Sequence, residues 1–119
     1  MGVDRKIVVV SPGSVELGEE PLDPDSVLEG DPRTAAGEIA SAPLADGSTL
    51  ETGVWTCTPG VVTDVEADET FVVLSGHARI EHDGEAYEVG PGDVCVLPAG
   101  AETKWTVYET LKKVYVLIS

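Results

Sequence analysis

Short apolar segments separated by turn residues at close intervals constrain the fold of this chain more than any other feature. From residue 51 onward, segments rich in Val, Ile, Tyr and Trp alternate with turn signals such as Pro59-Gly60, Ser75-Gly76 and Gly90-Pro91-Gly92. No segment repeats its apolar residues with the 3.6-residue period of a helix. The pattern predicts strands at about residues 51–58, 61–66, 70–74, 77–82, 85–89, 93–97, 103–108 and 112–118. Short strands at this spacing predict an all-β sandwich or small barrel.

The Asp83-Gly84 dipeptide predicts the tightest connection between strands. It lies between HARIEH and EAYEV, and this pair of residues is typical of a two-residue type I′ hairpin. Ala78 and Ile80 alternate with polar residues in the strand before it. Successive side chains of a strand point to opposite faces, so Ala78 and Ile80 should face the core. Both histidines, His77 and His82, should then lie outside or at the turn.

The first 50 residues have a different composition. From Ser11 to Asp46 the chain is rich in Pro, Gly, Asp, Glu, Ser and Ala, and its prolines break any long helix or central strand. We therefore expect one domain with an extended N-terminal arm at residues 1–50 and a barrel at residues 51–119. The arm should carry short edge strands near Ile7–Val10 and Glu38–Ala40. Its low apolar content leaves open whether residues 11–32 are ordered.

The charge balance excludes several classes of partner. The 119 residues include 22 acidic and 7 basic side chains, for a net charge of −15. A chain this acidic has no general attraction for phosphate backbones or anionic lipid, so we expect no nucleic-acid and no membrane partner. The four apolar residues Ile7–Val10 are too few for the core of a signal peptide. We expect an acidic cytoplasmic domain.

The two cysteines, Cys57 and Cys95, lack a Cys-x-x-Cys motif and nearby paired histidines. Two buried free thiols are the favoured interpretation. A disulfide would require the fold to bring the two residues together.

Two signatures in the second half of the chain resemble those of the cupins. Gly92, Pro98 and Gly100 match Gly-x5-Pro-x-Gly-x2-His, and Glu69 and Gly76 match the end of His-x-His-x3,4-Glu-x6-Gly. The wider string from TGVWTCTPG to ETLKKVYV resembles the EutQ-like cupin family, which includes ureidoglycine aminohydrolase-type domains. The resemblance implies a cupin fold, which is an RmlC-like double-stranded β-helix or jelly-roll barrel. Because cupins commonly pair through strands, it also implies a homodimer.

The resemblance points to a metal centre whose ligand positions this chain does not fill. Metal-binding cupins place two histidines and a glutamate from the first signature, and a histidine from the second, inside the barrel. Here the first two histidine positions fall on Val62 and Asp64, or on the residues that follow each of these, and the third falls on Thr103. Only Glu69 remains of the set that suits Fe, Mn, Ni or Zn. We expect no cofactor, although oxygen ligands from Asp64 and Glu69 leave open a weakly held divalent metal.

The cupin ligand positions, together with strand alternation, imply a set of side chains around one interior cavity. Thr103 and Trp105 should point the same way, inward if Thr103 occupies the vacant ligand position. The residues predicted to bind a ligand are Trp55, Val62, Asp64, Glu69, Thr103, Trp105 and Tyr115. An aromatic wall with a few polar groups is typical of a small-molecule pocket, but large aromatics also fill the cores of small β-proteins. Both interpretations of the tryptophans stay open.

Glu69 is the candidate catalytic residue. A carboxylate inside an apolar barrel is a candidate general acid or base, because desolvation favours its protonated form. Lys113 could instead pair with Glu69 and keep it charged, and an exposed glutamate in the turn ADET is a further interpretation. The sequence favours a cupin that binds a small polar molecule, and an anionic ligand would need Lys104 or Lys113 nearby. The alternative is a cupin enzyme of hydrolase, isomerase or epimerase type with Glu69 as acid or base.

Overall fold

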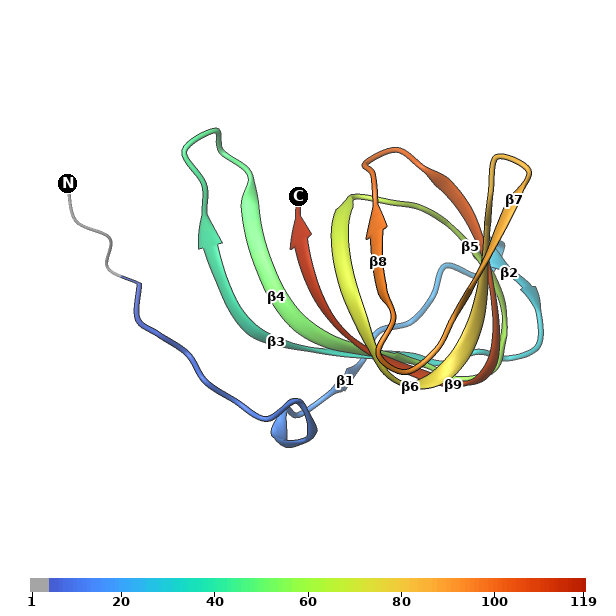
Figure 1. The fold of residues 1–119 in the computed structure, drawn as a ribbon, viewed down its shortest axis with the longest axis horizontal. Coiled ribbons are helices and arrows are strands. Elements are labelled where there is room, and N and C mark those ends of the chain that lie inside the picture. The colour runs from blue at the N-terminus through green and yellow to red at the C-terminus, as the bar shows by residue number, and fades with distance from the viewer. Residues whose placement is uncertain (1–4) are drawn as a thin grey trace.

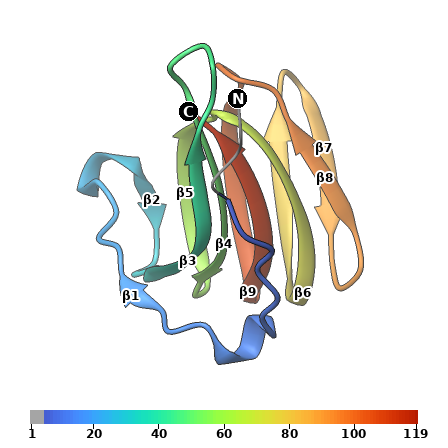
Figure 2. The same ribbon diagram turned by 90° about the vertical axis from the view of Figure 1, so that its left-hand side faces the viewer.

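The computed structural model describes residues 5–119, and most of its regular structure is β-strand (Figure 1 and Figure 2). In chain order the elements are η1 (Pro12–Ser14), β1 (Gly18–Glu19), η2 (Pro24–Ser26), β2 (Val27–Glu29), β3 (Thr34–Pro43), β4 (Thr49–Cys57), β5 (Gly60–Val65), β6 (Asp68–His82), β7 (Glu85–Val89), β8 (Val94–Leu97) and β9 (Glu102–Ile118). The predicted all-β class is confirmed. No helix within residues 5–119 combines the length and the apolar composition that crossing a membrane requires.

The last strand, β9, organises the sheet. Its second half pairs antiparallel with β4 on one side and with the first half of β6 on the other. Its first half pairs with β5 and with the second half of β6. The strand order is β1-β3-β4-β9-β5-β2, and β7 and β8 both pair with β6. Figure 1 shows the long strands curving, so that the sheet closes over its own inner face.

Two pairs of predicted short strands are single long strands. Segments 70–74 and 77–82 both belong to β6, and segments 103–108 and 112–118 both belong to β9. Ser75-Gly76 is therefore not a turn between strands. The pairing of β6 with β9 is irregular between Val73 and Ala78, and a bulge of this kind bends a strand without ending it. This bend lets the two strands take part in both halves of the curled sheet.

The hairpin and its strand are as predicted. Asp83 and Gly84 have φ values of 51° and 79°, and two consecutive positive φ angles define a type I′ turn. Ala78 and Ile80 are 0% and 2% exposed, whereas the side chain of His77 lies outside the core.

The core lies on the inner face of the curl. It consists of Cys57, Val62, Phe71, Val73, Ala78, Ile80, Val89, Leu97, Trp105, Val107, Leu111 and Tyr115. These residues alternate with outward-facing ones along β6 and β9, as strand geometry requires. Burying each large apolar side chain contributes about 1.5–3 kcal/mol, so the core holds the two halves of the sheet together.

Both cysteines are free thiols, as favoured from the sequence. Cys57 is buried, and Cys95 is half-buried. Burial raises the pKa of the Cys57 thiol to about 11 and also raises the pKa of the Cys95 thiol. Because the thiolate is the reactive form, neither residue is a good nucleophile at neutral pH.

The N-terminal arm differs from the prediction in two places. Residues 7–10 do not form a strand, because no neighbouring strand pairs with them, and Ile7 is 94% exposed. The short strand expected at Glu38–Ala40 is part of the ten-residue β3, which pairs with β4 along its length. Residues 11–32 contain η1, β1, η2 and β2. The division of the chain at residue 50 stays a prediction.

The outer face of the sheet carries an exposed apolar patch, which we call the outer valine face: Val94, Val96, Val116 and Ile118. These side chains are 40% to 72% exposed. Thr70 of β6 pairs with Val96 of β8 on one side and with Val116 of β9 on the other, so the patch extends across three adjacent strands.

We expect Gly76→Ala to lower the free energy of unfolding more than Gly92→Ala. Both glycines have positive φ angles, near +89° and +88°, and alanine is strained there by about 1–2 kcal/mol. Only at Gly76 would the added Cβ overlap β9, since it would collide with the carbonyl oxygen of Thr110, whereas the space at Gly92 is open. Urea denaturation of the two variants measures the difference. Equal losses would contradict the close approach of β6 and β9 at the bulge.

Candidate functional site

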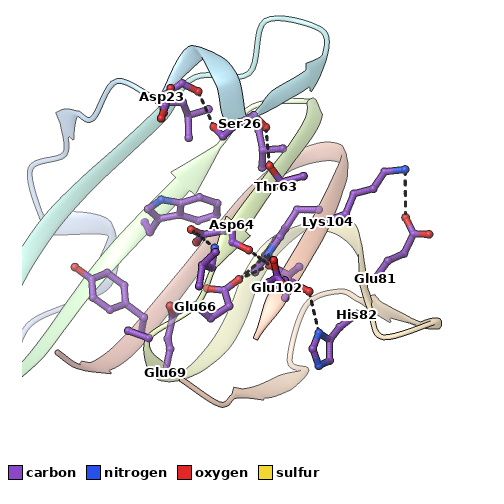
Figure 3. Close-up of a pocket in the computed structure, with 18 of the residues that line it drawn as sticks. Asp23, Ser26, Thr63, Asp64, Glu66, Glu69, Glu81, His82, Glu102 and Lys104 are labelled. Atoms are coloured by element: carbon purple, nitrogen blue, oxygen red, sulfur yellow. Dashed lines mark hydrogen bonds and ion pairs between the residues drawn. The ribbon is translucent and has the colours of Figure 1, made fainter. Parts of the chain in front are cut away.

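A pocket of about 1250 Å³ opens into the curled sheet (Figure 3). All of the residues predicted to surround an interior cavity line it: Trp55, Val62, Asp64, Glu69, Thr103, Trp105 and Tyr115. They come from four strands, β4, β5, β6 and β9. That they bind a ligand stays a prediction.

The pairing of β5 with β9 explains how part of this set comes together. Val62 lies opposite Trp105, and Asp64 lies opposite Thr103. Thr103 and Trp105 share the inner face of β9, as alternation predicted, and the Trp105 Nε1 donates to the Thr103 Oγ1 over 3.1 Å. Asp64 is exposed, and its carboxylate accepts a hydrogen bond from the Val65 amide. Asp64 therefore belongs to the rim of the pocket rather than to its interior.

The two tryptophans have different surroundings. Trp105 is 4% exposed and belongs to the core, with its ring centroid 5.6 Å from that of Phe71. Trp55 is only half-buried, and its ring meets that of Trp105 edge-on at 5.9 Å. Trp105 thus fills the core and lines the pocket at once, whereas Trp55 has free surface toward the pocket.

Tyr115 lies deep in the pocket, opposite Gly53 across β4 and β9. A Cβ at Gly53 would lie 2.5 Å from the phenol oxygen, so the absence of a side chain there makes room for the tyrosine. The Tyr115 hydroxyl donates to the Glu51 carboxylate. Burial and then this carboxylate raise the pKa of the Tyr115 phenol above its ordinary value. The phenol is therefore a hydrogen-bond donor that stays neutral at physiological pH.

Glu69 is paired with Lys113. The two side chains are 10% and 6% exposed, and the Lys113 Nζ lies 2.5 Å from the Glu69 Oε2. The ammonium also lies 4.5 Å, 4.4 Å and 5.0 Å from the ring centroids of Trp55, Phe71 and Trp105. Of the interpretations that the sequence left open for Glu69, this geometry agrees with the charged pair and not with an exposed turn residue.

Glu66 is the central carboxylate that the sequence analysis did not single out. It is 6% exposed, and its Oε2 accepts hydrogen bonds from the Thr103 hydroxyl at 2.7 Å and from the Trp105 indole at 3.0 Å. Burial is the main cause that raises the pKa of the Glu66 carboxyl, and the Asp64 carboxylate adds to it, while the two hydrogen bonds act in the opposite direction. Glu66 is therefore a buried acid with a raised proton affinity, next to the pocket.

The alternation of β5 gives only a partial signal for Glu66, which directly follows the strand. Val62, Asp64 and Glu66 are spaced two residues apart, so they share a face. The acidic run that contains Glu66 resembles a solvated turn, and this hid the residue. Main-chain hydrogen bonds fix its position, since its amide donates to the Ala101 carbonyl and its carbonyl accepts from the Gly100 amide.

The lining of the pocket is strongly acidic. It contains eleven carboxylate side chains and three basic ones, Arg79, Lys104 and Lys113. The Lys104 Nζ lies 3.8 Å from a carboxylate oxygen of Glu81, so two of the three cations already face a carboxylate. Figure 3 shows this pair at the rim, near His82.

The residues at the cupin ligand positions do not fit a metal ion. Val62 has no donor atom, and the Thr103 hydroxyl is engaged with Glu66. The remaining ligand, Glu69, is engaged with the Lys113 ammonium. Within residues 5–119, no three His, Cys, Asp or Glu side chains gather in a way that could hold a metal ion.

Comparison with known proteins agrees with this architecture. The sequence profile of the EutQ-like cupin domain matches residues 44–115. A Pseudomonas syringae pv. tomato protein of unknown function from the DUF861 family has a similar structure, with a TM-score of 0.76 and 24% sequence identity. The match covers 89% of this chain but only 45% of the Pseudomonas protein, so this chain spans less than half of that protein's length. Clostridium difficile EutQ gives a TM-score of 0.60 and 15% identity, covering 82% of this chain and 79% of its own.

A cupin superfamily protein from Desulfitobacterium hafniense gives a TM-score of 0.59 and 16% identity, covering 71% of this chain and 76% of its own. No curated protein sequence matches the chain. These likenesses confirm the predicted cupin fold, and at such identities they carry no statement about activity.

We expect Glu66→Gln to gain stability relative to the wild type as the pH rises from 4.5 toward neutrality. Burial raises the pKa of Glu66 in the folded state above its ordinary value of 4.5, so folding must overcome a cost of ionisation that grows as the pH rises through the raised pKa. Below pH 4.5 the carboxyl is protonated in both states, and the cost is absent. Glutamine cannot ionise but keeps an acceptor oxygen for Thr103 and Trp105.

Urea denaturation across this pH range measures the difference between the variant and the wild type. Glu88→Gln, an exposed position on β7, is the matched control and should show no such trend. A difference for Glu66→Gln that does not change with pH would contradict the raised proton affinity.

Proposed function

This chain belongs to the EutQ-like cupin domain family, and on that premise we propose that it binds a small polar molecule, neutral or positively charged, in the pocket of its curled sheet. The acidic lining of the pocket, with eleven carboxylates against three basic side chains, is the observation that carries the proposal.

The charge of the lining favours some ligands and disfavours others. A cleft lined by one sign of charge raises the local concentration of molecules of the opposite sign and lowers that of molecules of the same sign. Two of the three cations that could offset this effect for an anionic ligand already face a carboxylate, Lys113 that of Glu69 and Lys104 that of Glu81, which leaves Arg79 against eleven carboxylates. A carboxylate or phosphate ligand would therefore enter against a net repulsion.

The aromatic and polar groups of the pocket support a ligand of modest size. Trp55 offers a half-buried indole, a surface on which an apolar stem or a cationic head can lie. The Tyr115 hydroxyl donates its proton to Glu51 and can accept a hydrogen bond from a polar group of the ligand. The Oε2 of Glu66 already accepts from Thr103, so its other oxygen is the one that can accept or donate. Such a combination of apolar wall and few polar groups is typical of small-molecule sites.

An enzymatic function is the second candidate, and Glu66 is the observation that favours it. A proton-transferring carboxyl works best when its pKa lies nearer to neutrality than that of a free glutamate, and burial moves the pKa of Glu66 in that direction. In such an enzyme we propose Glu66, rather than Glu69, as acid or base, because the Lys113 ammonium already holds the Glu69 carboxylate.

We also propose that two copies of the chain pair through the outer valine face. The four side chains of this face are uncharged and exposed, although the chain as a whole carries a net charge of −15. Two negatively charged copies repel one another over most of their surfaces, so an apolar patch is the place where they can meet, and a two-fold axis lets it contact itself.

We expect small amines or neutral polar molecules, and not monocarboxylates, to raise the melting temperature of the protein. A thermal-shift screen of matched amines, amides, alcohols and carboxylates measures this. Trp55→Ala should abolish the shift of any molecule that binds. Tyr87→Ala, an exposed aromatic position on β7, should leave the shift unchanged. Stronger shifts with carboxylates, or undiminished shifts in Trp55→Ala, would remove the proposal.

We expect Val96→Glu to convert a dimer into a monomer, because Val96 is the most exposed residue of the outer valine face, at 72%. The substitution would bring one carboxylate from each copy into the proposed contact. Light scattering coupled to size-exclusion chromatography gives the mass of each form. A monomeric wild type, or a dimer that Val96→Glu does not weaken, would show that the face does not pair two copies.

A further inference from the structure

Lys113 has the surroundings of a bound cation rather than those of a surface lysine. It lies on β9, opposite Trp55 of β4 and Val73 of β6, and its side chain is 6% exposed. The Nζ faces one carboxylate oxygen, of Glu69, at 2.5 Å. Three aromatic rings surround it at 4.4–5.0 Å.

These neighbours compensate for the removal of the ammonium from water. A buried ammonium is strongly unfavourable unless it is paired and hydrogen-bonded. Glu69 supplies the opposite charge, and the faces of Trp55, Phe71 and Trp105 supply the negative side of their quadrupoles. Aromatic rings with a carboxylate form the kind of cage that proteins use to bind ammonium ligands. In this chain the cage contains the ammonium group of Lys113, a cation that belongs to the protein itself.

The position of the cage in the fold indicates what the ammonium replaces. Glu69 occupies the one cupin ligand position whose residue type this chain retains, while the others hold Val62, Asp64 and Thr103. We propose that the Lys113 ammonium is the resident cation of this barrel: it takes the place of a metal ion against Glu69 and keeps divalent metals from that carboxylate. The proposal goes beyond ligand binding and does not rest on it.

The proposal has a consequence for the protein without this ammonium. Lys113→Ala removes three methylene groups and the nitrogen, which together have the shape of n-propylammonium. The rings and the Glu69 carboxylate remain, so the emptied cage should accept this ion from solution. A ligand that binds only the folded state stabilises it in a saturable manner.

The test is the melting temperature of Lys113→Ala with n-propylammonium chloride, with 1-propanol as the uncharged equivalent and sodium chloride at equal ionic strength. We expect Lys113→Ala to melt well below the wild type and to recover at least about half of the loss with saturating n-propylammonium. The alcohol and the salt should not restore it. Lys112→Ala, the neighbouring position on the opposite face of β9, should show no such recovery.

The double variant Lys113→Ala, Glu69→Gln separates the cage from a general effect of amines. It lacks the carboxylate, so n-propylammonium should stabilise it no more than 1-propanol does. Equal recovery in the single and double variants would overturn the proposal, as would recovery of Lys113→Ala by the alcohol alone.

A measurement on the wild type keeps the proposal testable if Lys113→Ala does not fold. Titration of the wild type with Mn²⁺, followed by electron paramagnetic resonance, should show no saturable binding site that depends on Glu69. One Mn²⁺ per chain, bound in the wild type and lost in Glu69→Gln, would show that the carboxylate is open to metal and would overturn the proposal.

Discussion

The buried pair of Lys113 and Glu69 joins the parts of the barrel on which the site depends. Glu69 comes from β6 and Lys113 from β9, and the aromatic rings around the ammonium come from β4, β6 and β9. Removing one member of such a pair would leave an uncompensated charge in the interior, which costs about 3–5 kcal/mol, whereas together they satisfy each other. The pair and its rings therefore form only when these three strands keep their register. The same register forms the inner wall of the pocket.

The pair also makes the two carboxylates of the pocket interior chemically different. Glu69 has an ammonium partner, whereas Glu66 has two neutral donors, Thr103 and Trp105, and a raised pKa. The Lys113 ammonium neutralises the charge of Glu69. Glu66 is instead a carboxyl that can hold or release a proton at a pH nearer to neutrality. The acidic rim then adds a negative field that neither residue offsets. This division of roles supports the proposed preference for neutral or cationic molecules.

Periodicity and turn chemistry were sufficient to predict the all-β class and the type I′ turn at Asp83-Gly84. The residues that line the pocket were predicted with the resemblance to the cupin signatures. Periodicity and turn chemistry could not predict that β6 is continuous, because a bulge and a turn share the same glycine signal at Gly76. Nor could they choose among the roles of Glu69, since its partner lies 44 residues away in sequence. Glu66 was missed because only the tertiary fold distinguishes a buried acid from its exposed neighbours in an acidic run. The strand expected at residues 7–10 has the right composition but no partner strand.

The central claim is that the Lys113 ammonium is held as a bound cation inside the barrel. Nitrogen-15 NMR of the side-chain ammonium groups tests it on the unmodified protein, because the chain has only four lysines, Lys6, Lys104, Lys112 and Lys113. One ammonium signal should be protected from exchange with water, shifted upfield by the rings, and absent in Lys113→Met. Four ammonium groups that all exchange and resonate like free lysine would contradict the account.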